Sequence, residues 1–162
     1  MQKFNKQFIL GLLSEIKDPE NPVINIVEMG IVQDVLVNDD ELEVILTPTY
    51  SGCPAMDLLD SQIHDLLIDY GFSKVNVTKV YKPAWTTDWM SAQTKGKLRS
   101  YGIAPPQGLA LGKRELLRQK SIICPLCSSD NTEQISHFGS TACKALYKCK
   151  VCMEPFDYFK CF

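Results

Sequence analysis

Two pairs of cysteines near the end of the chain constrain its folding more than any other feature. Each pair has the spacing Cys-x-x-Cys, and 21 residues separate Cys124 and Cys127 from Cys149 and Cys152. This arrangement lets two tight turns present four thiolates to one tetrahedral cation. We therefore predict a metal ribbon over residues 120–162. Zinc is the favoured ion, and a rubredoxin-like iron site is the alternative, because the same ligands serve both metals.

The metal of this ribbon is expected to be structural. A segment of about 40 residues cannot bury enough apolar surface to fold unaided, so the metal has to supply the missing stability. A four-cysteine site also has no open coordination position, and we assign it no catalysis. Two further cysteines, Cys143 and Cys161, are interpreted as core fillers, with an alternative ligand or a contact to a transferred metal left open.

Cysteine use and charge limit the remaining classes of protein. Seven cysteines without an export signal favour metal ligation or reactive thiols in the cytoplasm over a disulfide framework. No apolar run approaches the roughly 20 residues of a membrane span, so we expect no membrane partner. Residues 1–109 carry 9 basic and 14 acidic side chains, and residues 110–162 carry 8 and 5. The small excess of basic over acidic side chains in residues 110–162 is too small to predict nucleic-acid binding.

The first part of the chain alternates between helix and strand patterns. Apolar residues recur at helical spacing over residues 6–17, and the polar, proline-containing segment 18–22 ends that helix. Residues 31–37 and 41–47 are rich in β-formers and flank a short polar turn, which predicts an antiparallel hairpin. Within the second strand, a buried set alternates with a solvent-facing set: Leu42, Val44 and Leu46 against Glu41, Glu43 and Thr47.

A second helix and a third strand follow the hairpin. Pro54 suits the first turn of a helix, and Gly71 suits its end. Residues 75–81 alternate like a strand that joins the hairpin, and a short helix is expected before Tyr101. The apolar stripe of the second helix is Met56, Leu59, Ile63, Leu66, Leu67 and Tyr70.

These elements predict an α+β protein. We expect a small two-layer α/β domain (helix, β-hairpin, helix, strand) over residues 1–102, a linker over residues 103–119, and a C-terminal zinc ribbon over residues 120–162.

Cys53 is the thiol that stands apart from the ribbon. It precedes Pro54 at a predicted helix N-terminus, where the helix dipole lowers a thiol pKa; Asp57 opposes this, so a modest depression is expected. A thiolate here is able to take a metal transiently, whereas a buried cap residue is the equally weighted alternative.

Asp18 and Glu20 are expected in a solvated turn, but fold-back near Cys53 would make a mixed oxygen–sulfur site suited to iron.

We expect no intrinsic catalytic site. Neither His64 nor His137 is near Cys53 in the sequence, and no nucleophile–base pair or phosphate-cradling loop is present. Trp85 and Trp89 are interpreted as core or interface residues in preference to a stacking platform.

Residues 8–90 resemble the metal-sulfur cluster assembly (SufT-like) domain family. The motifs are Asp18-Pro19-Glu20, Glu28-Met29-Gly30-Ile31-Val32 and Thr47-Pro48-Thr49-Tyr50-Ser51-Gly52-Cys53-Pro54. The resemblance implies that an Asp, a Glu, a Thr and a Cys gather at one surface site that handles iron or an iron-sulfur cluster transiently. In this chain the matching residues are Asp18, Glu20, Thr49 and Cys53.

Further motifs resemble the PaaD family of subunits associated with bacterial phenylacetyl-CoA epoxidase. They lie at residues 83–90, 101–106, 138–147 and 154–157. This resemblance implies a role in phenylacetate degradation that supports maturation of the oxygenase system. Our leading hypothesis is a maturation factor that aids iron or iron-sulfur assembly, with the ribbon docking a client. Its expected partners are the oxygenase and iron-sulfur reductase subunits, and a homodimer is left open. The alternatives are a structural subunit of the epoxidase complex and, ranked lower, a nucleic-acid-binding regulator.

Overall fold

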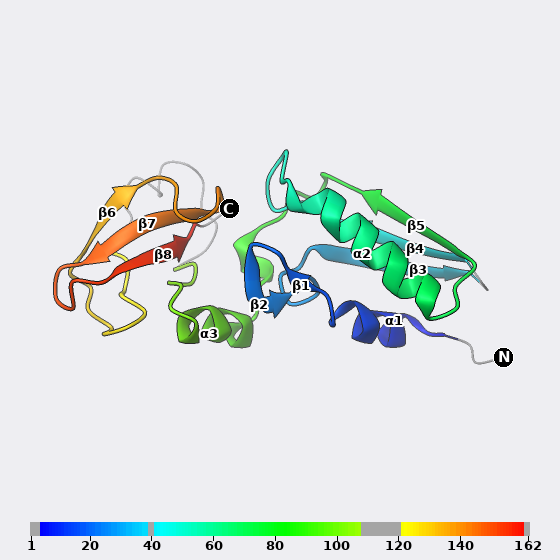
Figure 1. The fold of residues 1–162 in the computed structure, drawn as a ribbon, viewed down its shortest axis with the longest axis horizontal. Coiled ribbons are helices and arrows are strands. Elements are labelled where there is room, and N and C mark those ends of the chain that lie inside the picture. Colours follow the sequence, from blue (N-terminus) through cyan, green and yellow to red (C-terminus); the bar gives the residue numbers. More distant parts are fainter. Residues whose placement is uncertain (1–3, 39–40, 108–120, 161–162) are drawn as a thin grey trace. The chain divides into compact units, whose positions relative to one another are not determined.

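The computed structural model describes residues 4–38, 41–107 and 121–160. The chain divides into a first unit, Met1–Trp85, and a second unit, Thr86–Phe162. Each unit is described by itself (Figure 1).

No helix in the described ranges is long and apolar enough to cross a membrane.

The first unit is built on a three-stranded sheet in the order β3-β4-β5. Strands β3 (Val32–Asn38) and β4 (Glu41–Leu46) pair antiparallel, which confirms the predicted hairpin. Strand β5 (Lys74–Lys79) lies parallel to β4 on its other side, with Val44 opposite Val77. A parallel neighbour needs a crossover connection, and helix α2 supplies it.

Two helices complete the first unit, as the sequence predicted. Helix α1 (Lys6–Leu13) contacts β3, and helix α2 (Ala55–Asp69) contacts β5 (Figure 1). The side chain of Asn5 caps α1 by accepting a 2.8 Å hydrogen bond from the Phe8 amide. Tyr70 is exposed and does not belong to the apolar stripe of α2; the fully buried members are Leu59, Ile63 and Leu67.

The predicted helix over residues 6–17 is wrong over its last four residues, 14–17. Helix α1 ends at Leu13, and the chain then forms a two-stranded hairpin from β1 (Lys17–Asp18) and β2 (Asn21–Asn25). Ile16 lies after the end of α1 but is still buried, which explains why it fits the apolar spacing of the helix in the sequence. The Asp18 carboxylate stabilises the turn by accepting from the Glu20 amide at 3.0 Å and from Asn21 Nδ2 at 2.9 Å.

The alternation in β4 is confirmed up to the end of the strand. Leu42, Val44 and Leu46 are buried. Thr47 is buried as well, against the prediction, because β4 ends at Leu46 and strand alternation no longer applies. Its amide instead donates to the Ile31 carbonyl at 2.8 Å.

The second unit contains the predicted ribbon. Strands β6 (Thr132–Ser136), β7 (Lys144–Cys149) and β8 (Pro155–Phe159) form an antiparallel sheet in sequence order. A 3-10 turn, η1 (Thr87–Trp89), and helix α3 (Ala92–Ser100) precede it, and α3 is the short helix expected before Tyr101. The ribbon core is small: Ala104, Ile122, Cys124, Ala145, Cys149, Phe156 and Tyr158.

The compact first unit ends at Trp85, whereas the α/β domain was predicted to extend to residue 102. Helix α3 is tied to the second unit, because Arg99 donates to the Ser128 hydroxyl at 2.7 Å. Ala104 pairs with the last ribbon strand: its amide donates to the Asp157 carbonyl at 2.8 Å, and its carbonyl accepts from the Phe159 amide at 2.9 Å. The first residues of the predicted 103–119 linker are therefore part of the ribbon unit. Residues 108–119 lie outside the described part of the chain.

Trp85 is a core residue of the first unit, and its indole gives a test of the packing. Its Nε1 donates a buried 2.9 Å hydrogen bond to the Met29 carbonyl. Trp85→Phe removes this donor from a buried acceptor and leaves ring volume unfilled, so we expect the free energy of unfolding to fall by about 2–4 kcal/mol. Urea unfolding followed by circular dichroism measures it. Trp89→Phe, at a partly exposed position, should change it by less than about 0.5 kcal/mol.

Candidate functional site

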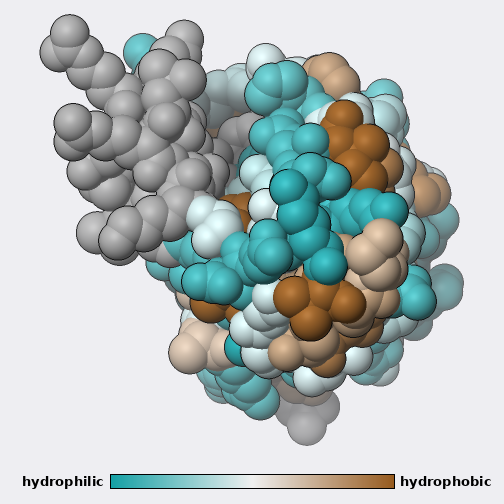
Figure 2. All heavy atoms as spheres, turned by 90° about the vertical axis from the view of Figure 1, so that its left-hand side faces the viewer, coloured by the Kyte–Doolittle hydropathy of each residue, from teal (hydrophilic) through white to brown (hydrophobic). Residues whose placement is uncertain are grey.

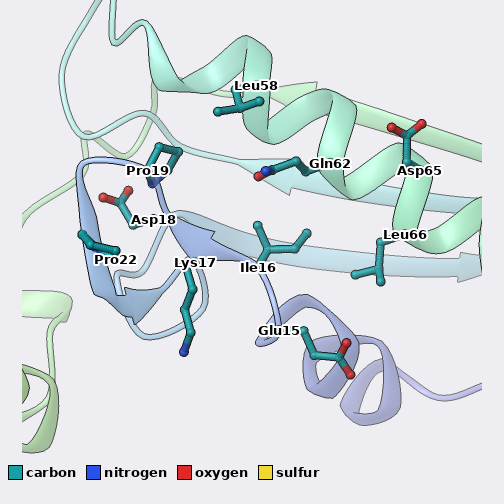
Figure 3. A pocket seen from close by; sticks show the side chains of 10 residues that line it. All are labelled: Glu15, Ile16, Lys17, Asp18, Pro19, Pro22, Leu58, Gln62, Asp65 and Leu66. Carbon is teal, nitrogen blue, oxygen red and sulfur yellow. The ribbon is translucent and has the colours of Figure 1, made fainter.

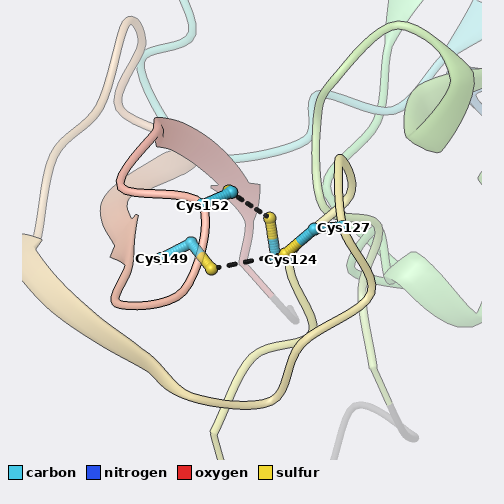
Figure 4. A group of neighbouring side chains, drawn as sticks. All are labelled: Cys124, Cys127, Cys149 and Cys152. Carbon is cyan, nitrogen blue, oxygen red and sulfur yellow. Dashed lines mark hydrogen bonds between the residues drawn. The ribbon is translucent and has the colours of Figure 1, made fainter.

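The four ribbon cysteines gather at one point of the second unit. Cys124 and Cys127 lie in the loop before β6, Cys149 is the last residue of β7, and Cys152 lies in the turn between β7 and β8 (Figure 4). All four Sγ atoms lie within 4.8 Å of one another. The Sγ atoms of Cys124 and Cys152 are 3.8 Å apart, and those of Cys127 and Cys149 are 3.5 Å apart.

Two similar backbone turns hold these sulfurs. The residue after each pair has a positive φ, 63° at Ser128 and 65° at Met153, which turns the chain back around the sulfurs. The Ser128 amide donates to the Cys124 carbonyl at 3.0 Å, and the Val151 amide points at the Cys149 sulfur from 3.4 Å. Local backbone geometry therefore orders both pairs.

Electrostatics make this cluster a cation site. The amides of Cys152 and Val151 lower the pKa of Cys149 to about 6. The pKa of Cys152 is raised to about 12, because burial and the other three sulfurs outweigh a favourable contact with the Glu154 amide. One thiolate forms readily and the next does not, so full ionisation requires a positive charge among the sulfurs.

The spacing of the sulfurs fits a tetrahedral metal ion. Metal–sulfur bonds of about 2.3 Å place the sulfurs of a tetrahedron about 3.8 Å apart, close to both short distances in this cluster. Cys124 and Cys149 are fully buried, whereas Cys127 is exposed. Four protein ligands fill the coordination shell, so this centre holds a metal without offering it to a substrate.

Cys53 lies in the first unit, in the loop that leads into α2. Its thiol is free and partly exposed. Pro54 is the residue before α2 and provides no side-chain cap, and the Cys53 amide donates to the Tyr50 carbonyl at 3.3 Å. The sulfur is accordingly held at a helix N-terminus, as the sequence predicted.

The predicted depression of the Cys53 pKa is wrong. Burial raises the pKa of the Cys53 thiol, and the nearby Glu20 carboxylate raises it further. The Ala55 amide and hydrogen bonds from Tyr50 and Thr49 act in the opposite direction without overcoming burial. Cys53 therefore rests as a neutral thiol near pH 7. Asp57, expected to oppose the helix dipole, instead pairs with Lys79 at 2.8 Å.

Tyr50 connects Cys53 to the β1–β2 turn, and sequence reasoning missed it. Its hydroxyl donates to Glu20 Oε1 at 3.2 Å across 30 residues of sequence. Burial raises the pKa of the Tyr50 phenol, and the neighbouring charges of Cys53 and Glu20 raise it further. We define the thiol site as Glu20, Thr49, Tyr50 and Cys53. The only sequence feature that could have indicated the role of Tyr50 is its position in the loop just before Cys53.

Asp18 occupies a supporting position beside the thiol site. It is almost fully buried, and its hydrogen bonds go to the Glu20 amide and to Asn21. Burial raises the pKa of the Asp18 carboxyl, opposed by the Asn21 hydrogen bond. Among the described residues, the ribbon quartet is the only group of three or more His, Cys, Asp and Glu side chains close enough to hold a metal. Asp18, Glu20 and Cys53 thus form no preassembled three-ligand site.

The remaining cysteines differ in what can be said of them. Cys143 is fully buried in the second unit outside the quartet, with the Thr141 hydroxyl 3.0 Å from its sulfur. Cys161 lies outside the described residues.

Comparisons with known proteins match both units. The family model described as an iron-sulfur cluster assembly protein matches residues 6–80, and that of the PaaD zinc beta ribbon domain matches residues 111–160. The chain is 47% identical to a putative 1,2-phenylacetyl-CoA epoxidase subunit of Escherichia coli K12, over 94% of this chain and 91% of that protein. It is 35% identical to the Fe-S protein maturation auxiliary factor YitW of Bacillus subtilis, over 59% of this chain and 94% of that protein.

Solved structures match the α/β part. A domain of unknown function, DUF59, from Bacillus anthracis has a TM-score of 0.53 and 26% identity, covering 57% of this chain and 90% of its own. A conserved hypothetical protein from Thermotoga maritima has a TM-score of 0.52 and 26% identity, covering 60% of this chain and 97% of its own.

The quartet predicts a single bound metal ion per chain. Its removal by a strong chelator should unfold the second unit, because the small ribbon core depends on the metal, while the first unit keeps its structure. Metal analysis and NMR spectra before and after chelation measure both effects. Cys149→Ser should abolish stoichiometric binding, whereas Cys143→Ala should retain it. Freshly purified protein without metal would contradict the prediction.

Glu20 should control the ionisation of Cys53. Glu20→Gln removes a negative charge that raises the Cys53 pKa, so this pKa should fall. At a fixed pH below the pKa, more of the thiol is then ionised, and alkylation should become faster. Iodoacetamide labelling of Cys53 at a series of pH values, followed by mass spectrometry, measures the shift to lower pH. Asp57→Asn is the matched control and should leave the profile in place. Coincident wild-type and Glu20→Gln profiles would show that the carboxylate does not act on the thiol.

Proposed function

Since the chain belongs to the PaaD family of 1,2-phenylacetyl-CoA epoxidase subunits, we propose that it is a maturation factor that holds iron or an iron-sulfur cluster transiently at Cys53. Its role in the epoxidase system is that of an accessory protein. The observation that carries the proposal is the contrast between the two kinds of sulfur. The ribbon quartet is closed, whereas the Cys53 thiol is single, partly exposed and next to a carboxylate.

The chemistry of the thiol site suits reversible binding. On metal binding, Cys53 loses its proton to solvent and a sulfur–metal bond forms; on release, the thiol takes a proton back. The raised pKa of Cys53 favours the return step because the protonated thiol is the stable resting form. Glu20 provides a second, oxygen ligand, while Thr49 and Tyr50 hydrogen-bond the sulfur and Asp18 holds the turn that carries Glu20.

The ribbon is proposed to hold zinc and to dock a client. The family of the ribbon and its four-thiolate tetrahedron support structural zinc over a rubredoxin-like iron. Leu126, Val151 and Met153, which lie within or next to the cysteine pairs, are all more than half exposed. Figure 2 shows separate apolar patches among polar side chains on the side of the molecule where Figure 1 draws the ribbon. We propose that the exposed side chains next to the cysteine pairs form the contact with the client.

The proposed partners follow from the same family relationship. We propose that the chain acts on the oxygenase and iron-sulfur reductase subunits in the cytoplasm and performs no catalysis of its own. A structural subunit of the epoxidase complex is the second candidate, favoured by the exposed apolar residues of the ribbon. The two candidates differ in whether Cys53 is needed.

Cys53→Ser decides between them. The serine hydroxyl is a poor ligand for iron, so we expect epoxidase activity in cells and the cluster content of the reductase to fall to the level of cells lacking this protein. The variant should remain folded, because Cys53 is only partly buried. Ser51→Ala, in the same exposed loop, is the matched control and should have no effect. Undiminished cluster content together with stable co-purification would favour the structural subunit.

A further inference from the structure

A groove runs between helix α2 and the segment 15–22 of the first unit. Its volume is about 590 Å³. Figure 3 shows that Gln62 and Leu66 of α2 and Ile16 and Pro19 of the facing segment line the same space. The groove is formed within one unit and does not involve the ribbon.

The groove presents apolar surface that the core of the unit does not use. Helix α2 packs its fully buried residues, such as Leu59 and Ile63, into the core. Leu58 and the partly buried Leu66 line the groove, and Leu58 is 49% exposed. A leucine left half exposed in a hollow is a contact point for a side chain of a partner.

The charges of the groove select a basic partner. Glu15 and Asp65 line it together with a single lysine, Lys17, and no lysine or arginine among the described residues pairs with either carboxylate. Two carboxylates elsewhere in the first unit, Asp34 and Glu41, are paired with Lys6 and Lys74. Residues 1–85 carry 6 basic and 13 acidic side chains, so the surrounding field is negative as well.

The groove also borders the thiol site. Asp18 lines the groove and accepts the hydrogen bond of the Glu20 amide, and the Glu20 carboxylate accepts that of Tyr50. A segment seated in the groove is therefore next to the turn that positions the carboxylate beside Cys53.

We propose that this groove docks a short segment of a partner protein in which an apolar side chain is flanked by lysine or arginine. The partner is the protein that gives the cargo to the thiol site or takes it, and in this respect the inference rests on the proposed function. Apolar contact with Leu58 and Leu66 gives affinity, and the carboxylates of Glu15 and Asp65 select for basic flanks. A polyanion such as RNA is repelled by the same charges.

Helix α2 itself offers matched variants for the test. Leu58→Ser and Asp65→Lys change the groove, whereas Ile68→Ser and Asp69→Lys make the same chemical changes at exposed positions of α2 that do not line it. Each purified subunit of the epoxidase system is titrated with the full-length chain, and the affinity is measured by isothermal calorimetry. We expect each groove variant to weaken binding of at least one subunit about tenfold, the loss expected from one large apolar side chain or one reversed charge.

The salt dependence of binding and the controls decide the outcome. Binding should weaken as salt is raised, and this dependence should be smaller for Asp65→Lys than for the wild type. Equal weakening by the Ile68→Ser and Asp69→Lys controls, or no binding of any subunit to the wild type, would overturn the proposal. Cys53→Ser should bind the same subunit normally, so loss of cargo handling and loss of docking are separable.

Cross-linking identifies the occupant directly. Gln62→p-benzoylphenylalanine places a photoreactive group in the groove, and the same substitution at Asp69 is the control. The expected product joins position 62 to a segment of an epoxidase subunit that contains an apolar residue between basic ones. A cross-link to an acidic segment, to a second copy of this chain or to nucleic acid would overturn the proposal.

Discussion

The repulsion among four sulfurs crowded within 4.8 Å is the constraint on which the second unit depends. The cluster ionises one thiol readily and resists the next, and only a cation removes that conflict. Because the ribbon core consists of a few side chains around two of those cysteines, we expect metal binding and folding to be coupled. Cys53 does not belong to this sulfur cluster. A metal that binds it has to displace the proton of its neutral thiol. Under the proposed function, sulfur ligands hold a metal permanently in the second unit and bind one reversibly in the first.

The thiol site depends on a contact between two distant segments. The Tyr50 hydroxyl joins the loop before α2 to the β1–β2 turn, and the Asp18 carboxylate fixes that turn through the Glu20 amide. Glu20 is therefore positioned from both sides, by its backbone and by its side chain. A carboxylate held near a neutral thiol is a weaker site than a preassembled cage, and a carrier that must release its cargo needs such a site.

The sequence predicted the parts of the fold that have a local or periodic cause. The cysteine spacing is a local feature. The alternation of β4 and the apolar stripe of α2 are periodic patterns that repeat along each element. The β1–β2 hairpin was missed because β1 has only two residues, too few for a pattern, and Ile16 continues the helical spacing. Tyr50 and the direction of the Cys53 pKa shift depend on long-range contacts and burial, which position in the chain does not reveal. The pairing of Ala104 with β8 is likewise a long-range contact.

The position of the boundary between the two units also changes how the charges are distributed between them. Divided at residue 109, the chain shows a mild contrast, with 9 basic and 14 acidic side chains before it. Divided at Trp85, it has 6 basic and 13 acidic side chains in the first unit and 11 and 6 in the second. A net charge of -2 therefore conceals two units of opposite sign. The negative charge of the first unit attracts cations at long range, which suits the exchange of a cationic cargo that we propose for Cys53 and Glu20. The positive charge of the second unit opposes a cation, so a metal held there would depend on direct ligation by the four thiolates.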